Sequence, residues 1–176
     1  MRRIFTLAFL ALVFVTTLAT AQSSSSTSNQ LALVITPFLS CSPTRGIDFG
    51  TARKIDGPLF TSATNWAQWD CDTDQGNSIN LTFSLPATMI NPQATGLPVH
   101  LSYGTSSAFV DANGVRFDPS AGLSNDIVAN PAGHVVVTLG KPGSGGGPTE
   151  TIRADLSTAK AGTYSATVTL NVSVNP

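Results

Sequence analysis

The chain has 176 residues, with nine basic and ten acidic side chains and a formal net charge of −1 at pH 7. So little positive charge excludes the basic footprint of a nucleic-acid-binding protein. Charged residues make up 11% of the sequence, against about 25% in ordinary globular domains.

The first 21 residues have the layout of a secretory signal peptide. Arg2 and Arg3 form a basic start, an apolar core runs from Ile4 to Val15, and the small-residue ending Ala19-Thr20-Ala21 follows. The apolar core is too short to span a bilayer comfortably, which favours cleavage after Ala21 over a membrane anchor. We therefore expect an exported mature chain without an integral membrane segment, and its length suits one domain.

A short apolar segment on a flexible tether begins the expected mature chain. Residues Leu31–Phe38 read LALVITPF and follow a polar run, Gln22–Gln30. The apolar segment favours a strand. Such a strand must pair either within its own domain or with another molecule, and the residues alone leave both alternatives open. We assign residues 22–40 to this N-terminal extension and residues 41–176 to the domain that follows.

The two cysteines, Cys41 and Cys71, are expected to form a disulfide. An isolated pair in an exported chain is most often cross-linked. A metal site would need further ligands, and His100 and His134 lie in separate strand-like segments without ligand spacing. We predict no metal and no cofactor.

The remaining sequence indicates strands and turns, with no convincing helix. Alternating apolar and polar residues predict a strand over Ser78–Leu85, which the turn before it should join to Asn65–Cys71 as a hairpin. The glycine-rich tract 140–148 is expected to be a mobile hairpin loop. Other strands are predicted over Ile47–Gly50, Leu97–Tyr103, Ala108–Val110, Val115–Phe117, Val135–Leu139 and Thr151–Leu156. Many short strands with glycine and proline between them predict a β-sandwich or barrel.

The clearest predicted strand closes the chain at Tyr164–Val174. One face carries apolar residues at every second position over eleven residues, which indicates a long strand with one buried face. These residues are Tyr164, Ala166, Val168, Leu170, Val172 and Val174.

Two other features, an aspartate cluster and a tryptophan, suggest chemistry only weakly. Asp70, Asp72 and Asp74 have the spacing that starts a calcium-binding loop, but the pattern then fails at its glycine and at its final glutamate. We favour a polar strand end there and leave calcium binding open. Trp69 shares a face with Cys71 and is expected in the core, whereas the opposite residue, Trp66, is left open as a sugar-binding platform.

A catalytic constellation is not apparent. The sequence has no nucleophile elbow, and no pattern pairs a histidine with a nucleophile and an orienting acid. We therefore expect the protein not to be an enzyme.

The order of these features resembles the pilin subunits of the chaperone–usher type, especially the archaic branch with spore coat protein U-like domains. The resemblance rests on the signal peptide, the short apolar strand, the cysteine placement, the pair Phe49-Gly50, and the closing AGTYSATVTLNV at Ala161–Val172. It implies an immunoglobulin-like sandwich that lacks its last strand and is completed by donor-strand exchange, a form of β-augmentation.

The resemblance also implies residue roles and partners. Leu31, Leu33, Val34 and Ile35 would belong to the donor strand, and the acceptor groove edge would comprise Tyr164, Ala166, Val168, Leu170 and Val172. The partners would be neighbouring copies or related pilins, a periplasmic chaperone and an outer-membrane usher. The product would be a surface filament with a role in adhesion or biofilm, reached through the periplasm.

Two alternatives remain at this stage. The first is a stand-alone secreted immunoglobulin-like module that binds carbohydrate or a cell-wall partner, in which Leu31–Phe38 pairs within its own domain. The second is a secreted enzyme of an unfamiliar type.

Overall fold

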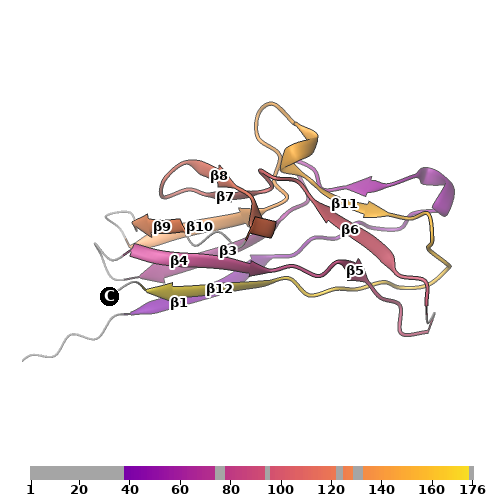
Figure 1. The fold of residues 1–176 in the computed structure, drawn as a ribbon, viewed down its shortest axis with the longest axis horizontal. Helices are drawn as coiled ribbons and strands as arrows, with labels where there is room; N and C mark the ends of the chain where they lie inside the picture. Colours follow the sequence, from indigo (N-terminus) through magenta and orange to yellow (C-terminus); the bar gives the residue numbers. More distant parts are fainter. Residues whose placement is uncertain (1–37, 74–77, 94–95, 122–124, 129–132, 175–176) are drawn as a thin grey trace, which may run out of the picture. The chain divides into compact units, whose positions relative to one another are not determined.

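The computed structural model describes residues 38–176 except 74–77, 94–95, 122–124, 129–132 and 175–176, and omits the side chains of residues 125–128. These residues form antiparallel strands with three short 3₁₀ helices (Figure 1), so the predicted all-β class is confirmed. The helices are η1 (Lys54–Asp56), η2 (Pro119–Ala121) and η3 (Pro148–Glu150). The strands are β1 (Leu39–Arg45), β2 (Leu59–Phe60), β3 (Ala67–Thr73), β4 (Ser78–Ser84), β5 (Thr88–Met89), β6 (Val99–Tyr103), β7 (Ala108–Val110), β8 (Val115–Phe117), β9 (Asn125–Val128), β10 (His134–Leu139), β11 (Ile152–Asp155) and β12 (Thr169–Val174).

Three sheets organise these strands. A five-stranded sheet has the order β1-β3-β10-β7-β8, a three-stranded sheet has the order β12-β4-β9, and a four-stranded sheet has the order β2-β11-β6-β5. The five-stranded sheet and β4 share one apolar core, so the two layers form a sandwich as predicted.

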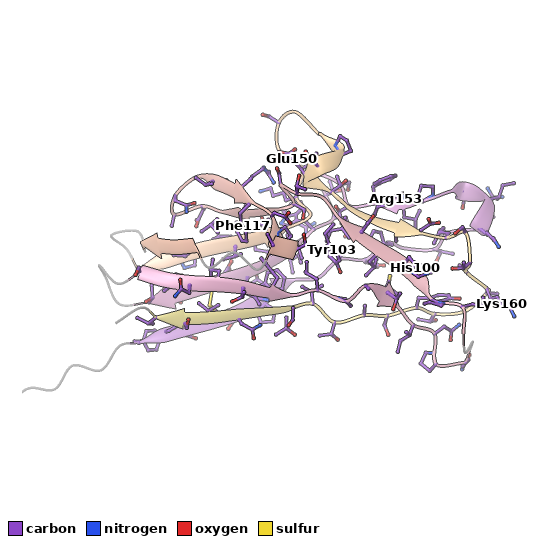
Figure 2. The ribbon with its side chains drawn as sticks, viewed as in Figure 1. His100, Tyr103, Phe117, Glu150, Arg153 and Lys160 are labelled. Carbon is purple, nitrogen blue, oxygen red and sulfur yellow. A yellow bond between two sulfur atoms is a disulfide. The ribbon has the colours of Figure 1, made fainter. Side chains whose placement is uncertain are left out.

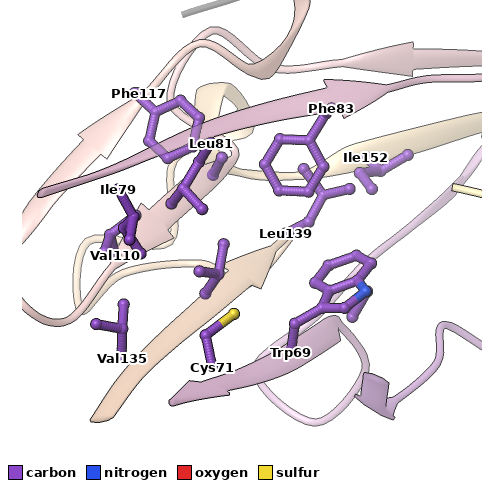
Figure 3. Packing of buried hydrophobic residues seen from close by; sticks show 13 residues of the cluster. Trp69, Cys71, Ile79, Leu81, Phe83, Val110, Phe117, Val135, Leu139 and Ile152 are labelled. Carbon is purple, nitrogen blue, oxygen red and sulfur yellow. The ribbon is translucent and has the colours of Figure 1, made fainter. Parts of the chain in front are cut away.

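The core follows from the period-two pattern of three central strands (Figure 3). Trp69 of β3 meets Phe83 of β4 edge to face, with ring centres 5.6 Å apart, and Phe83 stacks on Phe117 at 6.0 Å. The expected core position of Trp69 is confirmed, since only 9% of this residue is exposed. The buried apolar residues of the three strands are Ala67, Trp69, Cys71, Ile79, Leu81, Phe83, Val135, Val137 and Leu139.

The predicted disulfide is confirmed. Cys41 of β1 and Cys71 of β3 stand directly opposite each other in the antiparallel pair and are cross-linked. Cys71 is fully buried, whereas Cys41 is half-buried. The bond therefore holds β1 in register against β3.

The predicted hairpin of Asn65–Cys71 with Ser78–Leu85 is wrong. β3 and β4 lie in different sheets and face each other across the core. Both strands bury alternate residues, so the apolar pattern is satisfied by packing face to face as well as by pairing edge to edge.

The glycine-rich tract is not a hairpin loop either. It connects β10 to β11, which belong to different sheets. The Gly140 N–H donates to the Ser107 carbonyl at 2.6 Å, and the Gly143 N–H donates to a Glu150 carboxylate oxygen at 2.7 Å. These hydrogen bonds tie the tract to the body of the domain.

The closing strand is shorter than predicted. β12 begins at Thr169, and upstream of it Ser165 bridges Ile90 in a register that differs by two residues from that of β12 with β4. Pro86 lies in the stretch where the register changes, and proline has no N–H to donate to a ladder. Its carbonyl instead accepts a hydrogen bond from the Tyr103 hydroxyl at 2.8 Å, and burial raises the pKa of Tyr103 to about 12.

Candidate functional site: the open side of the sandwich

Two edge strands, β1 and β12, lie beside each other on one side of the sandwich (Figure 1). Their Cα atoms approach within 8 Å, yet in the described pairings β1 bonds only to β3 and β12 only to β4. We call these two strands and their core-facing apolar side chains the open side. The side chains are Leu39, Cys41, Val168, Leu170, Val172 and Val174.

Burial falls abruptly from β4 to β12. Val172 pairs with Leu81, and Val174 pairs with Ile79, so these side chains share one face of the sheet. Ile79 and Leu81 are 0% and 1% exposed, whereas Val172 and Val174 are only half-buried although they pack against the same core. The core therefore continues to β12 but is not covered there.

The exposure of apolar side chains also varies along the other edge of the five-stranded sheet. There Phe117 of β8 is 6% exposed, but Val115 on the same face of β8 is 49% exposed although its partner Val110 is fully buried. On the β1 edge, Leu39 and Cys41 are half-buried, and the preceding Phe38 is 54% exposed. Partly exposed apolar residues thus gather where β1 and β12 meet.

The residues predicted for the acceptor edge occupy different positions. Val168, Leu170 and Val172 are half-buried against the main core, whereas Ala166 is exposed. Tyr164 packs against a smaller cluster formed by Val99, Ala154 and Leu156. Its hydroxyl accepts a hydrogen bond from the Lys160 N–H at 2.9 Å and donates one to the Leu97 carbonyl at 3.3 Å.

A cleft of about 730 Å³ lies between the chain segments that adjoin the two edge strands. Residues 47–54, which follow β1, form one wall, and residues 159–164, which precede β12, form the other. Val99, Ala154 and Leu156 are among its apolar lining residues. We call it the edge cleft. The sequence analysis missed it, because its walls are irregular segments far apart in the chain.

Charged side chains line the edge cleft. Arg53 and Asp56 form an ion pair at 3.0 Å, and hydrogen bonds from the backbone and side chain of Arg53 lower the pKa of Asp56. Lys54 and Lys160 add two cations, and Figure 2 labels Lys160. Position 162 requires glycine, because its φ is +145° and the Cβ of any other residue would lie 1.9 Å from the Asn91 amide nitrogen.

The acidic residues considered for calcium are engaged with neighbours. An Asp70 carboxylate oxygen accepts a hydrogen bond from the Gln68 amide at 2.9 Å, and Asp72 pairs with His134 at 2.9 Å. The bond to Asp72 raises the pKa of His134. Asp74 lies outside the described residues. Within the described ranges, no group of three or more histidine, cysteine, aspartate or glutamate residues is placed to hold a metal ion.

The expected donor residues Leu31, Leu33, Val34 and Ile35, with the signal peptide and tether, lie outside the described residues.

No helix among the residues that the structure describes is long and apolar enough to cross a membrane. No protein-family model matches the sequence, and no curated protein matches it.

Proposed function

We propose that this chain is a structural subunit of a bacterial surface pilus or fimbria, of the archaic chaperone–usher type. In this proposal the sandwich is an immunoglobulin-like domain that lacks one strand, and the N-terminal strand of a neighbouring subunit completes it. The protein would pass through the periplasm with a chaperone on its open side. An outer-membrane usher would then guide assembly into a filament that serves adhesion or biofilm formation.

The drop in burial from β4 to β12 is the observation that carries this proposal. Apolar side chains in register with a fully buried row remain half-buried at an edge that has no second partner among the described strands. Such an edge offers both free backbone groups and apolar surface to an added strand. A short edge whose side chains were polar would support the proposal far less.

The chain carries a segment with the right length and chemistry for this edge. Leu31–Phe38 has eight residues and spans about 26 Å as a strand, which is enough to cover the six residues of β12, about 20 Å. Leu31, Leu33 and Ile35 form one row of alternating side chains. Burying four apolar residues of this kind contributes roughly 6–10 kcal/mol before the cost of ordering them.

The spacing between this segment and β1 favours a neighbour over the same domain. β1 begins at Leu39, so only Thr36, Pro37 and Phe38 separate it from Ile35. A strand that folded back between β1 and β12 would need a tight reversal in these three residues. Glycine, asparagine and aspartate, which favour such turns, are missing from them.

The proposal is tested by removing and restoring the donor strand. We expect the mature chain to polymerise and the chain without residues 22–38 to stay monomeric in size-exclusion chromatography with light scattering. A synthetic peptide of residues 22–38 should bind the shortened chain and raise its melting temperature. At a hundred times its dissociation constant it should stabilise by about 2.7 kcal/mol.

A matched control peptide carries Leu33→Asp and Ile35→Asp, which places two charges in the donor row, and it should not stabilise. Filaments formed by the shortened chain would refute donor-strand exchange. A mature chain that is a stable monomer without any chaperone would instead support the stand-alone module, with the strand paired in its own domain.

A further inference from the structure

Two cationic side chains converge on one indole ring. The Arg45 guanidinium carbon lies 3.6 Å from the centre of the Trp66 ring, and the Lys141 ammonium nitrogen lies 4.8 Å from the same centre. The three residues come from the end of β1, the segment before β3 and the segment after β10. Because a cation covers the ring, Trp66 does not present the open platform that a stacked sugar would need.

Among the residues that the structure describes, no acidic side chain forms an ion pair with either of these two positive charges. The ion pairs recorded for the described residues involve Arg53, Arg116, His134 and Arg153, and neither Arg45 nor Lys141 takes part in one. Arg45 donates a hydrogen bond to the Thr64 carbonyl, which leaves other guanidinium donors for a ligand. Two neighbouring cations on a domain with little charge create a local positive potential that attracts an anion.

An open cavity of about 570 Å³ has walls next to these cations, although neither cation lines it. Arg45 donates to the carbonyl of Thr64, which follows the lining residue Ala63, and Lys141 precedes the lining residue Pro142. One wall is residues 60–63, and the other is residues 142–146 with Pro148 and Thr151. Phe60 contributes a ring that is 49% exposed. Exposed hydroxyls of Ser62 and Ser144 stand on the two walls.

The cavity walls are held in place before any ligand binds. Glu150 (Figure 2) pairs with Arg116 at 2.8 Å, with 17% and 22% of the two side chains exposed, and also accepts the Gly143 N–H at 2.7 Å. On the other wall, the Thr61 hydroxyl accepts the buried Ile152 N–H at 2.9 Å. A wall fixed by such bonds loses little conformational freedom when a ligand binds.

We propose that Arg45 and Lys141, supported by Trp66, bind the carboxylate of an acidic sugar whose ring occupies the adjoining cavity. The guanidinium and ammonium groups match a carboxylate. The ring of Phe60 suits the C–H face of a sugar, and the serine hydroxyls suit its hydroxyl groups. The ligand is thus a hexuronate unit of an anionic polysaccharide. The site does not depend on donor-strand exchange, because none of its side chains is among the core-facing apolar side chains that a donor strand would cover.

The test uses the mature full-length chain and tri-galacturonic acid, with binding measured by calorimetry. Arg45→Gln and Lys141→Gln should each weaken binding by about tenfold or more, as expected for a lost charged hydrogen bond. Lys160→Gln removes the same charge at the edge cleft and should leave binding unchanged. The fully methyl-esterified trisaccharide, which lacks the carboxylate charges, should bind as weakly as tri-galacturonic acid binds the Arg45→Gln variant.

Several results would overturn the proposal. The first is that tri-galacturonic acid does not bind the native chain. The second is that Lys160→Gln weakens binding as much as Arg45→Gln and Lys141→Gln do. The third is that the methyl ester binds the native chain as tightly as the free acid does. Equal affinity for free acetate or for a tri-glutamate peptide would show a general anion site and would also refute the assignment to a sugar. Arg45 contacts the body of the domain, so Lys141→Gln in the exterior loop supplies the decisive variant if Arg45→Gln fails to fold.

Discussion

Replacing Leu170 by alanine is expected to cost little in the uncovered domain and more when a donor strand covers the open side. Leu170 is half-buried on β12, next to Phe83 of β4. Fully burying a leucine side chain is worth about 1.5–3 kcal/mol, so a half-buried leucine contributes roughly half of that. Leu81 is 1% exposed on β4, and its replacement by alanine should cost about 2–5 kcal/mol with or without a donor.

Binding of a donor strand is expected to change the cost of the Leu170 substitution but not that of the Leu81 substitution. With a peptide of residues 22–38 bound, the cost of Leu170→Ala should rise by about 0.8–1.5 kcal/mol, because the donor strand removes the remaining exposed surface. By thermodynamic linkage, Leu170→Ala must weaken peptide binding by the same free energy, which is roughly 4- to 13-fold. One substitution thus gives two measurements that must agree.

The assay is urea denaturation of the chain without residues 22–38, in the presence and absence of saturating peptide, together with direct titration of the peptide. Val137→Ala on β10, at a fully buried position, is the control, and its cost should not depend on the peptide. The reasoning is refuted if the cost of Leu170→Ala is the same in both conditions. It is equally refuted if the peptide binds both chains with one affinity.

Three further predictions concern stability. Cys41→Ser removes the disulfide, which closes a loop with a sequence separation of 30. The free energy of unfolding, measured by urea denaturation, should therefore fall by roughly 3–4 kcal/mol. A loss under about 1 kcal/mol would contradict this prediction. His134 has a raised pKa because it pairs with Asp72, so its contribution to the stability of the fold is complete below its unfolded pKa and disappears as pH rises through its folded pKa. An NMR titration should give His134 a lower pKa in the Asp72→Asn variant than in the native chain. An unchanged pKa would exclude the pair in solution. Gly162→Ala should destabilise by about 2–3 kcal/mol in thermal unfolding, because the positive φ is strained and Asn91 must move; an unchanged melting temperature would disprove that constraint.

The parts of the fold that follow from local pattern were predictable from the sequence. β4 and β10 have an apolar residue at every second position, and the structure buries those residues. The sequence of β1 is LSCSPTR, which has no such pattern and contains a proline. Its strand conformation comes from pairing with β3 and from the disulfide, both of which depend on residues far away in the sequence.

The partner of each strand was harder to predict than the strand itself. A buried face shows that a strand packs against something, but the pattern is the same for a hairpin partner and for a facing sheet. This ambiguity produced the wrong hairpin between β3 and β4. For the same reason, the alternation at Val168–Val174 predicted the inward face of β12 but not its incomplete burial, which depends on the absence of a further covering strand in the described fold.

The disulfide bears directly on which strand can cover β12. Cα atoms of β1 lie within 8 Å of β12, but Cys41 holds β1 opposite Cys71 in the five-stranded sheet. β1 therefore cannot move across to cover Leu170 and Val172 without losing its register with β3. On the proposed function, this cross-link keeps the open side available for an incoming strand. A reduced domain should then bind the peptide of residues 22–38 more weakly than the oxidised domain, because β1 is freer to shift toward β12 and compete for the same surface.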